Sequence, residues 1–300
     1  MGQILTHRRR NEMPTVAETI KEATECHLKR RKGLLFAQCV TAVGWIGGTV
    51  PDCEGIVELS MADVAGAGIA VGAALVGRRP IYVIRYQGFM WYDAAPLLNY
   101  AAKSKEMWGV PCPIFIRSIA SEGAGPVAGG SHHGMVMRMP GIKVFAPMTP
   151  NEWLEGWNWF LEHDEPVYCS EHRDSFKIGY EMVDVILPDS KITLLAISAA
   201  RLKVTDIPDA DIIHVTWLKP FNITNVMRDS LKKTGVGLLI DSDFEQSGKS
   251  IAHTLMLETG VPVHVVGLED RTAGFSKDTD NGTPSTEQIV ERIKEIKCKS

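Results

Sequence analysis

The chain lacks the features that mark membrane, nucleic-acid-binding and disulfide-linked proteins. No apolar run approaches the ~20 residues that a bilayer-spanning helix needs, and no signal peptide is visible. The formal net charge of −4 argues against nucleic-acid binding, which requires a basic surface. The six cysteines are scattered and include no Cys-x-x-Cys pair, which predicts reduced thiols in a cytoplasmic protein rather than disulfides or a zinc site.

Two common catalytic signatures are also missing. The chain has neither a Gly-x-Ser-x-Gly nucleophile motif nor a Gly-x-x-x-x-Gly-Lys-Ser/Thr phosphate loop. Gly66, Gly68 and Gly72 are spaced somewhat like a dinucleotide-binding fingerprint. That motif needs its glycines in the turn between a strand and a helix, whereas these lie inside a helical pattern. Close helix packing is the better interpretation of the three glycines.

The hydrophobic pattern predicts an α/β protein. The apolar fraction of 45% and the charged fraction of 23% are typical of globular proteins. Short apolar runs alternate with helical patterns, which favours a mainly parallel sheet flanked by helices. In the first half of the chain we expect strands near 34–37, 81–84, 114–116, 143–146 and 166–169, and helices near 16–32, 63–76, 91–108 and from 150 onward.

The pattern weakens over 174–190, where Gly179 and Pro188 stand, and a second, smaller α/β unit follows. We expect its strands near 192–197, 211–215, 236–240 and 261–266, and its helices near 223–233, 248–259 and 285–296. The predicted organisation is a flexible basic tail at 1–14, a first domain at 15–178, a linker at 179–190 and a second domain at 191–300.

A carboxylate opens the most unusual helix. Asp63 precedes a run made almost only of Gly, Ala and Val, which ends before the apolar strand 81–84. Small side chains let a helix backbone approach another helix or a ligand closely. Tyr86 and three further aromatic residues follow that strand, either as core residues or as a wall on which a planar ligand stacks.

Two histidines lie in a glycine-rich loop. His132 and His133 stand in the segment 123–134, after the strand 114–116, and α/β folds place their sites at such strand ends. Imidazole exchanges protons near neutral pH, which suits acid–base catalysis. Adjacent histidines point in different directions, and no nearby carboxylate or cysteine completes a ligand set, so we predict no metal site in this chain.

Taken together, these motifs resemble the beta subunit of thiamine-diphosphate-dependent 2-oxo acid dehydrogenases, within the transketolase family. The resemblance covers roughly 15–296 and rests on Gly68-Ile69-Ala70-Val71-Gly72-Ala73-Ala74, Gly77-x-Arg79-Pro80-Ile81, Asn99-x-Ala101-Ala102-Lys103 and Pro140-Gly141-Ile142-Lys143-Val144. It implies a pyrimidine-binding domain followed by the transketolase C-terminal domain.

The resemblance also implies roles for single residues. A glutamate at the position of Asp63 hydrogen-bonds a ring nitrogen of the cofactor's aminopyrimidine and so favours the imino form that activates the thiazolium carbon. Tyr86 matches the aromatic residue that stacks on that pyrimidine. His132 matches the histidine that handles substrate protons, and His133 is expected to assist it at the substrate. Catalysis would thus rest on Asp63 and His132, and cofactor binding on Asp63 and Tyr86.

The chain departs from the family pattern in three ways. Asp63 is shorter than glutamate by one methylene, roughly 1.5 Å of reach. The segments 36–56, 132–140 and 198–211 are short, so a helix of the second domain is expected to be reduced or absent. The Gly-Asp-Gly motif that anchors Mg²⁺ and the diphosphate is missing, as the family implies for a beta-type chain whose alpha-type partner supplies it.

The expected protein is therefore the beta subunit of a two-alpha, two-beta heterotetramer that binds thiamine diphosphate with Mg²⁺ and acts on a 2-oxo acid or a ketose. A lipoyl transacylase remains open as a further partner. Two alternatives also remain open. One is a split transketolase or a subunit like deoxyxylulose-phosphate synthase, which the Ser131–Gly134 loop favours. The other is a regulatory paralogue without catalysis.

Overall fold

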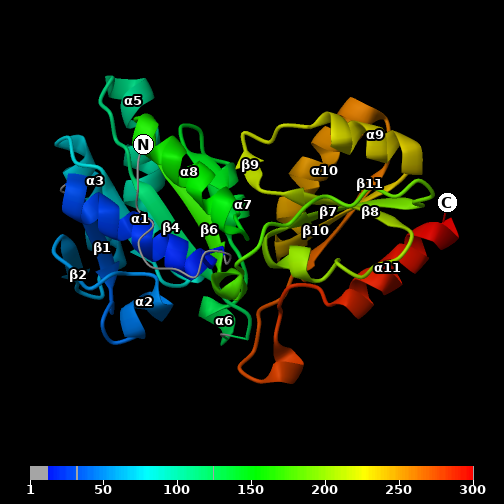
Figure 1. Cartoon of the computed structure of the whole chain (residues 1–300), viewed down its shortest axis with the longest axis horizontal. Coiled ribbons are helices and arrows are strands. Elements are labelled where there is room, and N and C mark those ends of the chain that lie inside the picture. The colour runs from blue at the N-terminus through cyan, green and yellow to red at the C-terminus, as the bar shows by residue number, and fades with distance from the viewer. Residues whose placement is uncertain (1–12, 32, 124, 300) are drawn as a thin grey trace.

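The computed structural model describes residues 13–31, 33–123 and 125–299 (Figure 1). The predicted basic tail, apart from Met13 and Pro14, lies outside the described residues. Two α/β units lie side by side, the first built from the N-terminal half of the chain and the second from the C-terminal half. The predicted class, two mainly parallel sheets flanked by helices, is confirmed.

Within the described residues, the first sheet has seven strands in the order β2-β1-β3-β4-β6-β5-β9. The first six are parallel to one another, and β9 pairs antiparallel to β5. Their bounds are β1 Leu34–Gln38, β2 Ile56–Leu59, β3 Pro80–Ile84, β4 Phe115–Ala120, β5 Lys143–Phe145, β6 Val167–His172 and β9 Trp217–Lys219.

Helices cover both faces of this sheet because its buried strands are apolar on both sides. Leu35 and Phe115 pack toward α1 and α8, whereas Phe36 and Tyr82 pack toward α3 and the helices that follow it. The helices of this unit are α1 Val16–Arg31, α2 Gly44–Gly48, α3 Asp63–Leu75, α4 Met90–Pro96, α5 Ala102–Trp108, α6 Gly125–Ala128, α7 His133–Met137 and α8 Pro150–Glu162.

The helix expected at 91–108 is not regular throughout. α4 ends at Pro96, a π-helical segment spans Leu97–Ala101, and α5 continues from Ala102. Proline has no backbone N–H and its ring crowds the preceding turn, which disfavours a regular helix at this point. A short 3-10 turn, Gln87–Phe89, joins β3 to α4.

Over the same described part of the chain, the second sheet has four parallel strands in the order β11-β10-β7-β8. Only a 3-10 turn, Ser198–Leu202, stands between β7 and β8, which agrees with the expected loss of a helix there. The other elements are β7 Ile192–Ile197, β8 Ala210–Val215, α9 Asn225–Thr234, β10 Gly237–Phe244, α10 Glu245–Thr259, β11 Val263–Leu268 and α11 Thr286–Lys299.

The predicted linker 179–190 does not separate the two sheets cleanly. β9 follows it in sequence but belongs to the first sheet, and Val185 within it pairs with Ile212 of β8. Arg201 also reaches across and donates two hydrogen bonds of 2.7 Å to the carboxylate of Glu152 in α8. The predicted domain bounds therefore remain a prediction. The two units are connected by the pairing of β9 with the first sheet, by the pairing of Val185 with Ile212, and by the ion pair of Arg201 with Glu152.

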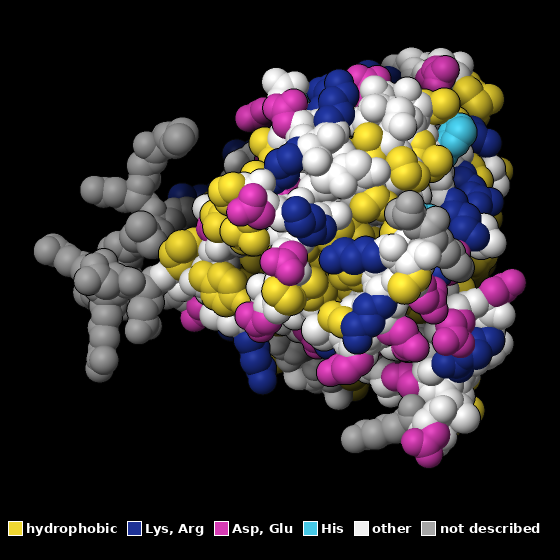
Figure 2. All heavy atoms as spheres, turned by 90° about the vertical axis from the view of Figure 1, so that its right-hand side faces the viewer, with side chains coloured by type: hydrophobic (Ala, Val, Ile, Leu, Met, Phe, Trp, Pro, Cys, Tyr) yellow, Lys and Arg dark blue, Asp and Glu magenta, His cyan; other side chains and the backbone are white. Residues whose placement is uncertain are grey.

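The surface formed by the second unit, at the end opposite the first sheet, mixes charged and apolar side chains. Figure 2 views the end where α9 and α11 lie, and acidic and basic side chains alternate there with small hydrophobic patches. Such mixing is typical of a solvated face. None of the helices formed by the described residues combines the length and apolar composition that a membrane span requires.

Candidate active site

Asp63 lies in a cleft at the carboxyl edge of the first sheet. It is the first residue of α3, where the helix dipole favours a negative charge. Gln38, the last residue of β1, donates a hydrogen bond from Nε2 to Asp63 Oδ1 at 3.3 Å. The cleft is lined by residues from both elements and from β3 and α4, namely Gln38, Cys39, Met61, Asp63, Tyr82, Val83, Ile84, Arg85, Phe89 and Asp93.

A second carboxyl, Asp93, lines the same cleft. Its side chain is buried, and the hydroxyl of Tyr82 donates to its Oδ1 atom at 2.7 Å. No described residue donates to its buried Oδ2 atom. Burial raises the pKa of Asp93 to about 7, and the charge of Asp63 contributes in the same direction. Sequence reasoning missed Asp93, because an acidic residue in a helical pattern ordinarily lies on the solvated face.

Two aromatic side chains, Phe89 and Tyr82, line the cleft, and the hydroxyl of Tyr82 is bonded to Asp93. Tyr86 is not among the lining residues, and its ring instead lies 5.0 Å from the guanidinium carbon of Arg85 and 4.9 Å from that of Arg173. The rings of Tyr86 and Phe89 meet edge to face with centroids 6.0 Å apart. Tyr86 thus stands behind Phe89, and Phe89 is the better placed of the two to contact a ring held beside Asp63.

His132 lies on the wall of a separate hollow between the two sheets. Its ring contacts Trp91 of α4 and Phe244 at the end of β10, with centroids 6.4 Å and 6.0 Å away. Burial lowers the pKa of His132 to about 4, and the neighbouring charge of His133 contributes. The imidazole is therefore neutral at physiological pH. The hollow is lined by Trp91, His132, Gly134, Met135, Arg138, Met139, Asp243, Phe244 and Ser247.

Gln87 connects the cleft to the hollow. Its Oε1 atom accepts the backbone N–H of His132 at 2.7 Å, and its Nε2 atom donates to the Ser118 carbonyl oxygen and to Ser170 Oγ. Gln87 and Phe89 belong to the same 3-10 turn. The turn after β3 therefore positions the ring that faces Asp63 and the backbone that carries His132.

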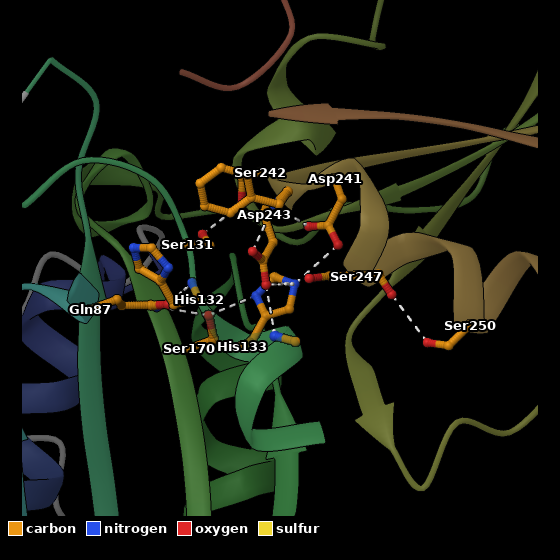
Figure 3. A network of polar contacts seen from close by, with 12 residues as sticks. Gln87, Ser131, His132, His133, Ser170, Asp241, Ser242, Asp243, Ser247 and Ser250 are labelled. Carbon is orange, nitrogen blue, oxygen red and sulfur yellow. Dashed lines mark hydrogen bonds and ion pairs between the residues drawn. The ribbon is translucent and has the colours of Figure 1, made fainter. Parts of the chain in front are cut away.

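His133 points away from the hollow into a buried polar network (Figure 3). Its Nδ1 atom lies 3.1 Å from Ser170 Oγ, and its Nε2 atom lies 3.1 Å from Asp241 Oδ2 and 3.7 Å from Asp243 Oδ2. Burial alone would lower the pKa of His133, but the two carboxylates outweigh it and raise the pKa, so the imidazolium form is favoured.

Asp243 holds the loop that carries His132 and also stabilises the positive charge of His133. It accepts the backbone N–H of Gly134 at 2.7 Å, and Ser131 Oγ lies 2.7 Å from Ser242 Oγ. Both ring nitrogens of His133 are engaged inside the protein, which does not support the predicted contact of His133 with substrate. The sequence held one signal for this network, because Asp241-Ser242-Asp243 follows an apolar strand directly.

Comparisons with known proteins agree with this architecture. The model of the transketolase pyrimidine binding domain matches residues 24–177. The pyruvate dehydrogenase E1 component subunit beta of Rickettsia felis is 25% identical over 273 aligned residues, covering 80% of this chain and 83% of the relative. The 2-oxoisovalerate dehydrogenase subunit beta of Bacillus subtilis is 26% identical over 226 residues, covering 64% of this chain and 66% of the relative.

Solved structures share the fold. A split-gene transketolase, described as an inactive beta4 tetramer, matches with a TM-score of 0.69 at 17% identity, over 94% of this chain and 98% of that chain. The transketolase of Campylobacter jejuni matches with the same TM-score and identity, over 97% of this chain but 48% of that chain. The chain thus corresponds in fold to about half of a full-length transketolase.

Proposed function

The chain belongs to the transketolase family through its pyrimidine-binding domain, and from this premise we propose that it is the beta-type subunit of a heteromeric thiamine-diphosphate enzyme. The observation that carries the proposal is the cleft at the carboxyl edge of the first sheet. A carboxyl group, that of Asp63, and an aromatic ring, that of Phe89, both line this cleft. An aminopyrimidine needs this pairing of a hydrogen-bonding carboxyl with an apolar ring contact.

The residues of the cleft fit the cofactor's pyrimidine. Asp63 would hold a ring nitrogen, with Gln38 orienting the carboxylate, and Phe89 would pack on the ring with Tyr86 behind it. The free Oδ2 atom of Asp93 offers a further polar contact. When bound, thiamine diphosphate would supply a nucleophilic thiazolium carbon. We assign the diphosphate and Mg²⁺ to the alpha-type partner.

His132 is proposed as the residue that moves protons at the substrate. Its neutral ring can accept a proton from one partner and donate one to another, which an imidazolium cannot do. Trp91 and Phe244 pack against the ring and exclude water from one side of it. His133 keeps the loop in place through Asp241 and Asp243 rather than touching the substrate.

Exposed apolar side chains support a partner subunit. Val64 and Ile69 of α3 are 55% and 50% exposed, and Tyr92 and Tyr100 beside them are 58% and 57% exposed. Large apolar patches of this kind mark protein interfaces. We propose that an alpha-type chain covers this face in a two-alpha, two-beta assembly located in the cytoplasm, with a lipoyl transacylase as a further partner where the acceptor is lipoyl.

Reconstitution with the alpha-type partner tests the proposal. The purified complex should bind thiamine diphosphate in the presence of Mg²⁺, measured by calorimetry, and the isolated chain should not turn over substrate. Assays with pyruvate, branched 2-oxo acids and ketose phosphates would distinguish a 2-oxo acid dehydrogenase from a split transketolase. A chain that is monomeric and fully active alone would contradict the split-subunit proposal, and a complex that binds the cofactor but turns over none of these substrates would favour a regulatory paralogue.

A further inference from the structure

Asp93 has the surroundings of a functional carboxyl rather than of a structural one. Its side chain is 1% exposed, yet only one of its two oxygens has a hydrogen-bond partner, the hydroxyl of Tyr82. A buried carboxyl in a purely structural role normally has both oxygens satisfied, because an unsatisfied buried polar atom costs about 1–3 kcal/mol. The unsatisfied atom belongs to a residue that lines the same cleft as Asp63.

The packing around Asp93 keeps it close to Asp63. α3, which begins with Asp63, packs against α4, which carries Asp93. Gly66 lets α3 approach the strand below, since a Cβ atom there would lie 2.9 Å from a Leu59 methyl and 3.4 Å from Tyr82 Oη. The charge of Asp63 acts on both Tyr82 and Asp93. The two carboxyls are therefore electrostatic neighbours in one cleft.

Two neighbouring carboxyls in a poorly solvated cleft do not ionise equally. Asp63 stands at a helix N-terminus and is partly exposed, whereas Asp93 is buried and keeps its proton below its raised pKa of about 7. With Oδ1 accepting from Tyr82, the proton of Asp93 resides on Oδ2. Asp93 is then a carboxylic acid that can donate a hydrogen bond to a ring nitrogen.

We propose that Asp93, held by Tyr82, is a second cofactor-contacting carboxyl, whose Oδ2 hydrogen-bonds the aminopyrimidine of thiamine diphosphate beside Asp63. This inference rests on the proposed function for the identity of the ligand. It accounts for the aspartate at position 63, because a carboxyl from α4 supplies the reach that the shorter side chain lacks. Asp63 and Asp93 then act on the ring as a pair.

The pairing itself is tested without any cofactor. In the full-length chain labelled with carboxyl-¹³C aspartate, NMR titration should show Asp93 titrating near neutral pH. Tyr82→Phe removes the donor to Oδ1 and should move the Asp93 transition to higher pH. Titration of Asp93 at the ordinary aspartate value, insensitive to Tyr82→Phe, would overturn the pair.

Cofactor binding tests the assignment of the ligand. In the complex with the alpha-type partner, calorimetry with thiamine diphosphate and Mg²⁺ should show at least a ~10-fold higher Kd for Asp93→Ala, as the loss of a buried hydrogen bond predicts. Asp93→Asn, whose amide can still donate, should keep most of the affinity but lose turnover. Asp206→Asn, at an exposed site beyond the first sheet, is the matched control and should change neither.

The outcomes separate the two proposals. If the unmodified complex fails to bind thiamine diphosphate, the proposed function is wrong, whatever the carboxyl titrations show. If the unmodified complex binds it and Asp93→Ala binds equally well, the role of Asp93 is wrong and the proposed function stands. Should Asp93→Ala fail to fold, Asp93→Asn decides the matter, because unchanged turnover and affinity in that variant contradict a carboxyl that contacts the ring.

Discussion

At the scale of single residues, the surroundings of each titratable group in the site determine its charge. Asp93, His132 and His133 are all at least partly buried, yet their pKa values move in different directions. Burial raises the pKa of Asp93 and lowers that of His132, because it disfavours the charged form of each. His133 is buried more completely, but two carboxylates reverse the effect of burial.

The first prediction concerns Asp93 and stability. Its pKa in the folded protein is about 7, above the value of about 4 for an unfolded chain. The folded state therefore holds a proton that the unfolded state has lost, and stability falls as pH rises from about 4 to about 7, by up to about 1.4 kcal/mol per pH unit. Asp93→Asn should remove this slope in urea unfolding followed across that range. A slope equal to that of the unmodified protein would contradict the raised pKa.

The second prediction concerns His132 and turnover. In the complex with its partner, His132→Gln should lower kcat about 10²–10⁴-fold, because general acid–base groups contribute on that scale, while the Kd for thiamine diphosphate changes little. The pKa of about 4 further predicts that ionisation of His132 leaves kcat unaffected between pH 5 and 8. A kcat transition near pH 6.5 that disappears in His132→Gln would contradict the lowered pKa.

At the scale of elements, the end of β10 and the start of α7 form a clamp between the two sheets. Asp243 contributes the acceptor for Gly134 N–H and part of the charge that holds His133 (Figure 3). Gly134 also lies so close to α10 that a Cβ atom there would fall 2.2 Å from Ser247 Oγ. The loop that carries His132 is therefore held by a close backbone approach and by a buried ionic network.

The third prediction tests this clamp. Asp243→Asn should destabilise the protein by about 3 kcal/mol near pH 7, because it removes one partner of a buried charged group. Burial raises the pKa of Asp243 to about 6, so this carboxyl is mostly ionised at pH 7. The raised pKa of His133 means that the stabilising charge of its imidazolium is lost as pH rises through the folded value, so the penalty should shrink at high pH. Urea unfolding at pH 7 and pH 10 measures it, and Asp270→Asn, at an exposed site, is the control.

The fourth prediction concerns the close approach of the turn before β5 to Ala102, the first residue of α5. Gly141 has a φ of +78°, and a Cβ atom there would lie 1.6 Å from the Ala102 carbonyl oxygen. Gly77 has a similar φ of +87°, with nothing within 4 Å of such an atom. Gly77→Ala should cost about 1–2 kcal/mol for its backbone conformation alone, and Gly141→Ala should cost more by several kcal/mol. Equal unfolding midpoints for the two variants would contradict the contact at Gly141.

At the scale of the whole molecule, α3 lies on the side of the first unit away from the second sheet (Figure 1), and large apolar side chains of this helix are exposed. Gly68 and Gly72 leave open space on α3, where a Cβ atom would meet nothing within 4 Å. Ile69 lies between them and is half exposed. This face can therefore admit a closely packed helix of another subunit.

The fifth prediction tests this surface. Ile69→Asp should lower the affinity for the alpha-type partner at least ~10-fold, since it places a charge in an apolar interface, and should leave the fold of the chain intact. Val183→Asp, at a position 72% exposed in the segment between the sheets, is the matched control. Analytical ultracentrifugation of mixtures gives the affinities. Association unaffected by Ile69→Asp would place the partner elsewhere.

The sequence by itself determined most of the longer elements and their order, but not short ones such as β2 and β9. Apolar runs and helical periodicities depend on neighbouring residues, so strands such as β3 and helices such as α3 were predictable to within a residue or two. The same local reasoning placed Asp63 at the head of α3 and His132 in a loop beyond a strand. Each of these features follows from residues close together in the chain.

Only the tertiary structure decided which groups meet and how strongly they are buried. Asp93 became a candidate because Tyr82 and the cleft surround it, and His133 became an anchor because Asp241, 108 positions later in the chain, lies 3.1 Å away. β9 joined the first sheet although it follows the predicted linker. The physical reason is the same throughout: desolvation and long-range pairing set the chemistry of a side chain, and no local pattern encodes either of them.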